Sequence, residues 1–135
     1  MSIYYFAYAT NINKKQMAEC CPGSKPKFSV VLPNYKLIFT GWSRQWKGST
    51  ASIKHFNGEK VQGALYELTD VDLRRLDRDE GYPSISDRIN ITVWTDTGDP
   101  VEAVTYIKRD QSQESKPSES YLAVIRQGYK EWQIE

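Results

Sequence analysis

The sequence predicts an α+β domain built on a small mixed sheet of about six strands, curved or barrel-like, with helices packed at its edges. Short runs of apolar or alternating residues, separated by turn residues, outnumber the helical patterns along the chain. The 135 residues are 39% hydrophobic and 13% aromatic, which is enough to build one core. Because no linker or internal repeat divides the chain, residues 1–135 are interpreted as a single domain.

Six segments are predicted to be strands because they are short, apolar or alternating, and flanked by turn residues. These segments are residues 3–8, 35–40, 50–55, 61–68, 88–95 and 101–108. Asn57-Gly58, between the third and fourth segments, is a strong hairpin signal and predicts a tight turn there. Pro33-Asn34 and residues 97–100 predict two further turns.

Helices are predicted at residues 13–20, 70–80 and 119–132. The second has the clearest boundaries, because Thr69 is suited to the N-cap and Asp72 completes an imperfect capping box. Gly81 suits the position after the last turn, and Pro83 prevents continuation. In the third helix we expect an interruption or bend near Gly128.

Charge and hydropathy exclude several functional classes. Eighteen basic and seventeen acidic residues leave a net charge of +1, which gives no general attraction to nucleic acid or to an anionic membrane. No run approaches the roughly 20 apolar residues of a membrane span. The start, MSIYYFAYATN, lacks the basic and apolar pattern of a signal peptide. We therefore expect a cytoplasmic protein with no membrane and no nucleic acid among its partners; its oligomeric state is left open.

The cysteines and the histidine give little support to metal or nucleophilic catalysis. Cys20 and Cys21 are adjacent, so a disulfide between them would close a strained ring, and two reduced thiols are expected. His55 is the only histidine, with no second metal ligand or nucleophile nearby, and is expected at the surface. No metal site is predicted.

Glu80 stands out in the charged stretch RRLDRDEGYP, residues 74–83. Leu73 and Leu76 form the apolar stripe of the predicted helix, and Glu80 follows Leu73 by seven residues, which misses two full turns by only about 20°. The carboxylate is therefore expected to face the core, where burial would raise its pKa toward neutrality and suit it to general acid–base catalysis.

The spacing of Glu80 leaves another interpretation open. The helix could fray before this residue, so that the side chain turns into solvent or pairs with an arginine. An acid near a helix C-terminus is mildly unfavourable with the helix dipole, which slightly favours a specific role for Glu80.

Four motifs in order resemble the gamma-glutamylcyclotransferase (AIG2-like) family. YFAYATN is similar to the family's YFAYGSN signature, and LDRDEGYP resembles its LDxxEG segment. LPNYKLIF with GSTASIKHFNGEKVQGALYELT resembles the family's central strands, and PSESYLAVIRQGYKEW resembles its closing segment. The resemblance covers nearly the whole chain.

The resemblance implies a small barrel with a pocket at one end and an enzyme that uses no metal or organic cofactor. Such an enzyme cyclises the gamma-glutamyl group of a small molecule to 5-oxoproline and releases an amine or amino acid, an acyltransferase or lyase reaction of glutathione-related metabolism. By match, Glu80 is the catalytic acid/base. The residues expected to bind substrate are Tyr5, Tyr8, Ala9, Thr10, Asn11 and Tyr121.

The chain departs from the family pattern in its first motif. Ala9 replaces a glycine and Thr10 replaces a serine. If the glycine were needed for positive φ, alanine would cost ~1–2 kcal/mol; if substrate approaches the backbone there, the methyl group intrudes. Relatives often carry a tyrosine soon after the glutamate, where this chain reads SISDR, so one substrate contact could be missing.

Two other functions stay open at this point. A non-catalytic or altered-specificity module could keep the pocket and bind a small amino-acid-like ligand, which the changes at Ala9 and Thr10 would explain. A single-stranded nucleic-acid surface is the weaker alternative. It would use interleaved basic and aromatic residues: Lys36, Phe39, Trp42, Arg44, Trp46, Lys47 and Lys54. In the enzyme, Trp42, Arg44 and Trp46 could instead contact the leaving group.

Overall fold

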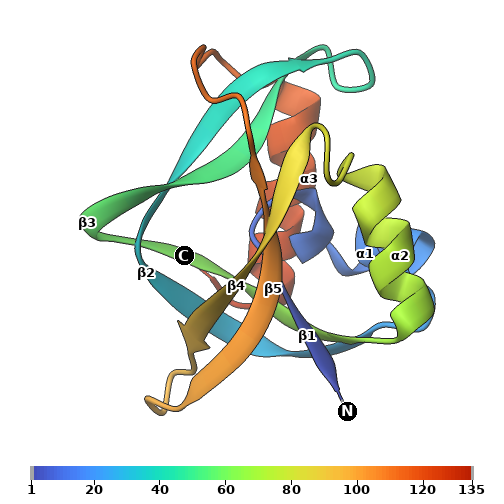
Figure 1. The fold of residues 1–135 in the computed structure, drawn as a ribbon, viewed down its shortest axis with the longest axis vertical. Helices are drawn as coiled ribbons and strands as arrows, with labels where there is room; N and C mark the ends of the chain where they lie inside the picture. Colours follow the sequence, from blue (N-terminus) through green and yellow to red (C-terminus); the bar gives the residue numbers. More distant parts are fainter. Residues whose placement is uncertain (1, 135) are drawn as a thin grey trace.

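The computed structural model, which describes residues 2–134, shows a closed barrel with helices around it (Figure 1). In chain order the elements are β1 (Ile3–Ala7), the 3-10 helix η1 (Thr10–Ile12), α1 (Lys14–Cys20), β2 (Lys25–Ser43), β3 (Gly48–Leu68), α2 (Asp70–Asp79), β4 (Ser86–Trp94), β5 (Pro100–Lys108) and α3 (Glu119–Glu131).

The strands follow the order β1-β3-β2-β4-β5, and the barrel closes where β5 meets β1. That closing pair is parallel, with Tyr5 opposite Val104, whereas the other neighbours are antiparallel. Closure leaves no unpaired sheet edge along these strands. The predicted fold class, a mixed barrel-like sheet with helices at its edges, is confirmed.

The strand count and two turns were predicted wrongly, because Pro33-Asn34 lies inside β2 and Asn57-Gly58 lies inside β3. The barrel has five strands because β3 runs through Asn57-Gly58, and the chain reverses instead between Ser43 and Gly48. Residues 56–59 bulge opposite Asn34, where the β2–β3 register shifts. Asn34 and Gly58 both have positive φ, 65° and 90°, and the Gly58 N–H donates to Asn34 Oδ1 (3.2 Å). The same backbone freedom that suits a hairpin serves a bulge, and here it bends a long strand (Figure 1).

The start of β2 was not predicted as a strand. Residues 25–34 contain two prolines, which weaken a strand prediction, yet they pair with the second half of β3 from Glu67 to Lys60. The pairing of Lys25 with Glu67 and of Pro33 with Lys60 marks its two ends. The extra length lets β2 and β3 contribute both to the barrel wall and to the projecting end that carries residues 43–48.

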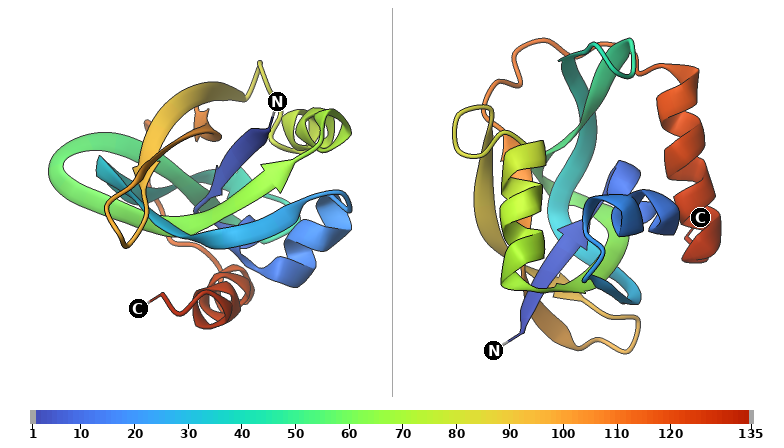
Figure 2. Two further views of the ribbon diagram at one scale, coloured as in Figure 1. Left: turned by 90° about the horizontal axis from the view of Figure 1, so that it is seen from below. Right: turned by 90° about the vertical axis from the view of Figure 1, so that its right-hand side faces the viewer.

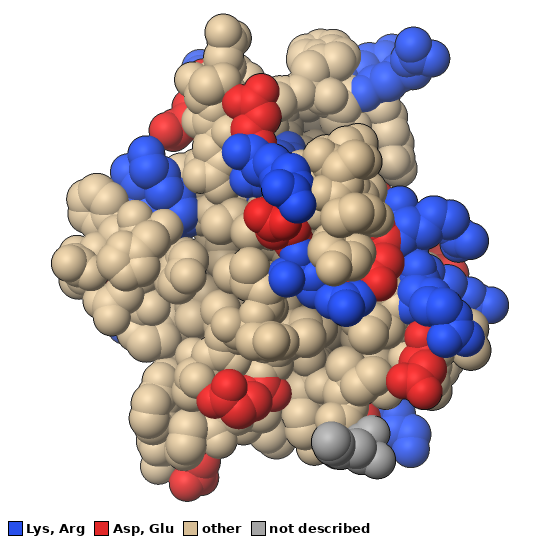
Figure 3. Space-filling model, viewed as in Figure 1, with Lys and Arg blue, Asp and Glu red and all other residues tan. Residues whose placement is uncertain are grey.

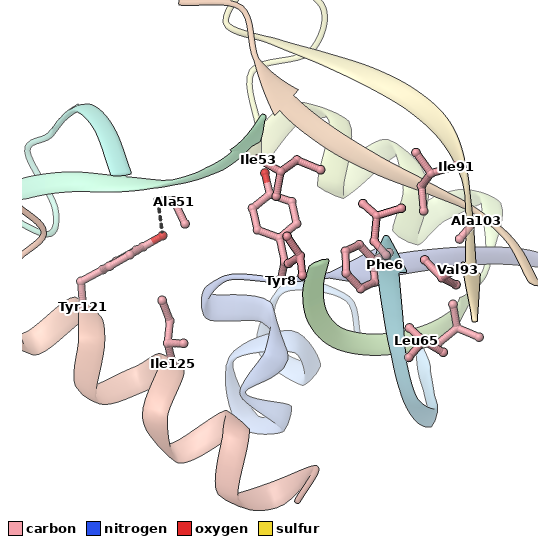
Figure 4. Close-up of a cluster of buried hydrophobic side chains, with 13 residues drawn as sticks. Phe6, Tyr8, Ala51, Ile53, Leu65, Ile91, Val93, Ala103, Tyr121 and Ile125 are labelled. Atoms are coloured by element: carbon pink, nitrogen blue, oxygen red, sulfur yellow. Dashed lines mark hydrogen bonds between the residues drawn. The ribbon is translucent and has the colours of Figure 1, made fainter. Parts of the chain in front are cut away.

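Two apolar clusters hold the fold. The first fills the barrel, where Phe6, Ile53, Leu65 and Val93 are fully buried side by side (Figure 4). The second packs the helices onto the outside of the sheet; its fully buried members include Met17, Tyr66 and Leu76. In both views of Figure 2, η1 and α1 lie between α2 and α3. The segment that follows β1 is therefore enclosed by helices on two sides.

The predicted start of α2 is confirmed, and the helix ends at Asp79, one residue before the predicted end. The Thr69 hydroxyl accepts from the Asp72 N–H (3.1 Å), and the Asp72 carboxylate accepts from the Thr69 N–H (3.3 Å), which completes a capping box. At the other end Glu80 is the C-cap, and Gly81 follows with a φ of 70°. Gly81 thus supplies the left-handed conformation that ends the helix.

Gly128 does not bend α3, contrary to the prediction. The helix is continuous from Glu119 to Glu131, and Gly128 lies buried against η1. A Cβ atom at Gly128 would stand 2.5 Å from Ile12 Cγ2 and 2.7 Å from the Asn13 nitrogen. The glycine therefore permits a close contact between the two helices. The Trp132 indole N–H donating to the Ile12 carbonyl (2.7 Å) fixes the same contact.

Within residues 2–134, none of the helices is long and apolar enough to cross a membrane.

Replacing Gly128 by alanine should destabilise the protein by about 1–3 kcal/mol, because the added methyl overlaps Ile12 and Asn13. Helix propensity alone predicts the opposite sign, a gain of about 1 kcal/mol. Urea unfolding of the variant measures the change. Gln127→Ala, at the neighbouring exposed position of α3, is the control and should be near neutral. A stabilised Gly128→Ala protein would contradict the close-contact explanation.

Candidate active site

A cavity of about 600 Å³ opens beside the end of β1. Its walls come from the β1–α1 segment, the ends of β2 and β3, the C-terminus of α2, β5 and α3. They comprise Tyr5, Tyr8, Ala9, Thr10, Asn11, Gln16, Glu19, Cys20, Ser43, Gln45, Trp46, Thr50, Ala51, Asp79, Glu80, Tyr106, Lys108 and Tyr121. All seven residues predicted for the site line this one cavity; their roles stay predictions.

Glu80 is held at the cavity by the end of α2. Its N–H donates to the Leu76 carbonyl (2.8 Å), so the helix does not fray before it. Among the described residues, Glu80 forms no ion pair with an arginine. Although the residue as a whole is partly exposed, loss of water around its carboxyl raises the pKa of Glu80 to about 7. The Asp79 charge raises this pKa further, and Lys108 lowers it.

Four tyrosines share the cavity wall with Glu80 and lie close enough to its carboxyl to be affected by its charge. Burial is the main cause that raises the pKa of Tyr5, Tyr8, Tyr106 and Tyr121, and the negative charge of Glu80 raises each pKa further. The pKa of Tyr121 reaches about 12. The phenols therefore stay protonated and neutral near pH 7, where they serve as hydrogen-bonding groups rather than as acids or bases.

Two of the four tyrosine hydroxyls donate their protons in hydrogen bonds within the protein. Tyr8 donates to the Tyr106 carbonyl (2.6 Å), and the Tyr106 hydroxyl donates to Asp77 Oδ1 (2.6 Å). Asp77 is in turn held by Arg88, whose Nη1 lies 2.5 Å from Asp77 Oδ2. The oxygens of Tyr8 and Tyr106 consequently offer lone pairs to a ligand, and a ligand ammonium group would suit them.

The other two tyrosine hydroxyls accept hydrogen bonds within the protein instead of donating them. Tyr121 accepts from the Ala51 N–H (2.7 Å; Figure 4), and Tyr5 accepts from the Asn11 side-chain amide (3.2 Å). Both phenols therefore keep a proton to donate. Trp46 packs edge-on against the Tyr121 ring, with centroids 5.3 Å apart, which fixes the direction of that hydroxyl. The cavity wall therefore carries two hydroxyls that can accept from a ligand and two that can donate to it.

The loop after β1 does not need a glycine. Ala9 has a φ of −124°, so the left-handed conformation that would penalise alanine is not used. Its methyl group lines the cavity, which leaves a steric effect on a ligand as the consequence of the replacement. Thr10 and Asn11 begin η1, and amides in the first turn of a helix have no acceptor within it. They can serve a ligand oxygen instead.

Lys108 was missed by the sequence analysis, which treated it only as the end of a strand. Its ammonium donates to the carbonyls of Thr40 (2.7 Å) and Thr50 (3.2 Å) and to the Thr50 hydroxyl. Burial lowers the pKa of Lys108, and Glu80 partly offsets this. Lys108 stands two residues after Tyr106, so strand alternation puts both on one face. That alternation was the available signal.

Cys20, Cys21 and His55 are arranged as expected. Both cysteines are free thiols, and the Cys20 thiol donates to Asp79 Oδ2 (3.1 Å) at the cavity wall. His55 is exposed on β3 and packs edge-on against Tyr35. Over the part of the chain that the structure describes, no three His, Cys, Asp or Glu side chains are grouped to hold a metal ion.

The surface proposed for single-stranded nucleic acid is broken up by packing. Phe39 and Trp46 both lie edge-on to Tyr121, so their faces do not form an open stacking platform with Trp42. On the face shown in Figure 3, basic and acidic side chains lie next to each other. This arrangement does not favour the nucleic-acid interpretation.

Comparisons with known proteins agree with the resemblance predicted from the motifs. A model of the AIG2-like family matches residues 60–134. The chain is 29% identical to gamma-glutamylcyclotransferase from Bos taurus and 27% identical to that from Homo sapiens, each over 96% of this chain and 71% of the relative. A solved gamma-glutamyl cyclotransferase structure superposes with a TM-score of 0.93 at 26% identity, over 98% of this chain and 80% of that one.

The raised pKa of Glu80 should make stability depend on pH. Folding favours the protonated carboxyl. The protein is therefore most stable with respect to this group below about pH 4.5, and it loses stability as pH rises from about 4.5 to about 7. Glutamine does not ionise, so the free energy of unfolding of Glu80→Gln, relative to that of wild type, should be higher at pH 8 than at pH 5 by on the order of 2 kcal/mol. Denaturant unfolding at both pH values measures this change. An equal difference at pH 5 and pH 8 would show that burial does not perturb Glu80.

Proposed function

This chain belongs to the AIG2-like family, and we propose that it is a gamma-glutamylcyclotransferase that closes the gamma-glutamyl group of a small amide into 5-oxoproline and releases the amine or amino acid. The observation that carries the proposal is the Glu80 carboxyl, with a pKa of about 7, among four tyrosine hydroxyls at the end of β1. The names of the relatives support the reaction class. The cytoplasmic location and a place in glutathione-related metabolism belong to the same proposal.

Substrate binding follows from the polarity of the cavity. The α-ammonium of a gamma-glutamyl group would lie beside Glu80 and the accepting oxygens of Tyr8 and Tyr106. Its α-carboxylate would take the donating hydroxyls of Tyr5 and Tyr121. Ionised Glu80 attracts the ammonium and is close enough in basicity to remove a proton from it.

The reaction needs only one carboxyl group because the nucleophile is part of the substrate. Glu80 takes a proton from the α-ammonium, and the freed amine attacks the γ-carbonyl carbon to close a five-membered ring. The bond from that carbon to the amide nitrogen then breaks, and protonated Glu80 donates to the departing nitrogen. In sum, two protons leave the α-nitrogen and both end on the amine, which is released as an ammonium ion.

The negative oxygen formed on attack requires donors. The amides of Thr10 and Asn11 open η1 beside the cavity and have no acceptor within it, so they can donate to this oxygen. Ala9 precedes them and narrows the approach by one methyl group. The replacement of glycine by alanine therefore bears on which substrates enter rather than on the chemistry.

Glu80→Gln should lower kcat by about 10²–10⁴-fold, because glutamine can neither accept nor return the proton. Formation of 5-oxoproline from a panel of gamma-glutamyl compounds measures the effect, and circular dichroism checks the fold. Glu59→Gln, at an exposed position of β3, is the matched control and should keep wild-type turnover.

Retained turnover in a folded Glu80→Gln protein would remove Glu80 from the mechanism. If wild-type protein turned over nothing on the panel but bound a gamma-glutamyl compound tightly, the alternative of a non-catalytic ligand-binding module would replace the enzyme.

The pH dependence of kcat/KM should show an acidic limb with a midpoint near 7, because ionised Glu80 is the base in the free enzyme. Asp79→Asn removes a negative charge that raises the pKa of Glu80, so its midpoint should move to lower pH. Initial rates from pH 5 to pH 9 measure both profiles. An unchanged midpoint in Asp79→Asn would contradict the assignment of this limb to Glu80.

A further inference from the structure

A second cavity adjoins the first on the far side of Glu80. It measures about 470 Å³ and opens between the end of β2, the segment after α2 and the segment after β5. The two cavities share five wall residues, namely Ser43, Thr50, Asp79, Glu80 and Lys108. Glu80 therefore stands at the boundary, with access to ligand atoms on both sides.

This position has a consequence that rests on the proposed function. If the gamma-glutamyl group fills the first cavity, the scissile amide nitrogen must also reach Glu80, because the same carboxyl returns the proton. Whatever is attached to that nitrogen then extends past the boundary and into the second cavity. The walls of this cavity would set the choice of leaving group.

One feature of the walls is exposed apolar surface. Trp42 at the end of β2 is 74% exposed and Ile85 before β4 is 65% exposed, and both line the second cavity. They come from segments 43 residues apart in sequence. Large apolar side chains on two sides of one cavity gain free energy when a ligand covers them. An apolar body of several carbons would do so.

The other feature is a shortage of available positive charge. Three acids, Asp79, Glu80 and Asp110, face this cavity against two bases, Arg78 and Lys108. Asp110 accepts from both the N–H and the hydroxyl of Ser112, which lowers the pKa of its carboxyl and keeps it ionised.

Neither base is well placed to receive an anion. The three N–H bonds of Lys108 are used on Thr40 and Thr50. The Arg78 side chain is 76% exposed and lies 3.8 Å from Asp79. An ion pair between Arg78 and a ligand carboxylate would therefore be screened by water. In a gamma-glutamyl α-amino acid, the leaving group carries a carboxylate on the carbon that bears the nitrogen. This carboxylate would be repelled by the acidic side chains of the second cavity and would find no fixed cation there to bind it.

From the exposed apolar side chains and the excess of acidic groups in the second cavity, we infer that this cavity binds the leaving group. It selects gamma-glutamyl amides of apolar amines, which carry no carboxylate, over gamma-glutamyl α-amino acids.

A matched pair of substrates tests the inference. Gamma-glutamylphenethylamine and gamma-glutamylphenylalanine differ only in the carboxylate of the leaving group. The amine derivative should have the higher kcat/KM by about tenfold or more, because like charges repel the acid. Equal or reversed values would overturn the inference. If neither compound nor any other gamma-glutamyl amide yields 5-oxoproline, the proposed function fails first and the leaving-group assignment falls with it.

Two tryptophans provide a matched pair of variants. Trp42→Ala should lower kcat/KM for gamma-glutamylphenethylamine by about fivefold and leave gamma-glutamylmethylamine unaffected, because only the larger amine reaches the indole. Trp94→Ala is the control: Trp94 is also an exposed strand-end tryptophan, at 41%, but lines neither cavity. An equal loss for both amides, or the same loss in both variants, would count against the subsite.

Binding measured without turnover completes the test. By calorimetry, Glu80→Gln should still bind gamma-glutamylphenethylamine more tightly than gamma-glutamylphenylalanine, by a smaller margin because one of the three acids is gone. A further Trp42→Ala change should weaken the binding of both compounds equally, because they share the apolar body, and should leave that preference in place. Arg78→Gln tests the alternative that Arg78 binds the carboxylate of the leaving group. If it weakens gamma-glutamylphenylalanine alone, then Arg78 does receive the carboxylate and the proposed selectivity is wrong; an unchanged preference supports it.

Discussion

The energetic constraint on this site is the transfer of one carboxyl group from water into a cavity walled by protein. Glu80 bears that cost because the capping box at Thr69, the apolar contacts of Leu76 and the left-handed Gly81 fix the end of α2. A residue at a fixed helix end cannot turn freely into solvent. Burial is the main cause that raises the pKa of Glu80, and two neighbours of opposite charge, Asp79 and Lys108, adjust it further. The chemistry proposed for the protein depends on that balance.

The barrel supplies the opposite wall. Closing β5 against β1 brings Tyr106 beside Tyr5 and Lys108 to the same cavity, although about a hundred residues separate them from Tyr5 in the chain. The bulge at Asn34 and Gly58 bends β2 and β3, whose far ends carry Thr40, Thr50 and Ala51 to the same place. On the outer side, the close contact at Gly128 holds the loop after β1 against α3. Each wall is thus set by backbone geometry away from the cavity.

Local patterns predicted the elements better than their connections. The caps of α2 and the inward direction of Glu80 follow from short-range spacing, and the seven predicted residues do meet at one cavity. Asn57-Gly58 was misjudged because positive φ serves a bulge as readily as a hairpin, and pairing decides between them. Lys108 and Tyr106 were missed since their partners, the Thr40 and Thr50 carbonyls and Asp77, lie 29 to 68 residues away. The long-range pairing that joins them is absent from any local window.

The fixed directions of the tyrosine protons give the cavity a handedness. Tyr8 and Tyr106 have used their protons and can only accept from a ligand, while Tyr5 and Tyr121 each still have an O–H to donate. A molecule bound with its ammonium and carboxylate exchanged, as the mirror-image amino acid would be, sets donor against donor and acceptor against acceptor. Stereochemical discrimination can thus arise from neutral groups alone, whose backbone and side-chain partners have oriented them before any ligand arrives.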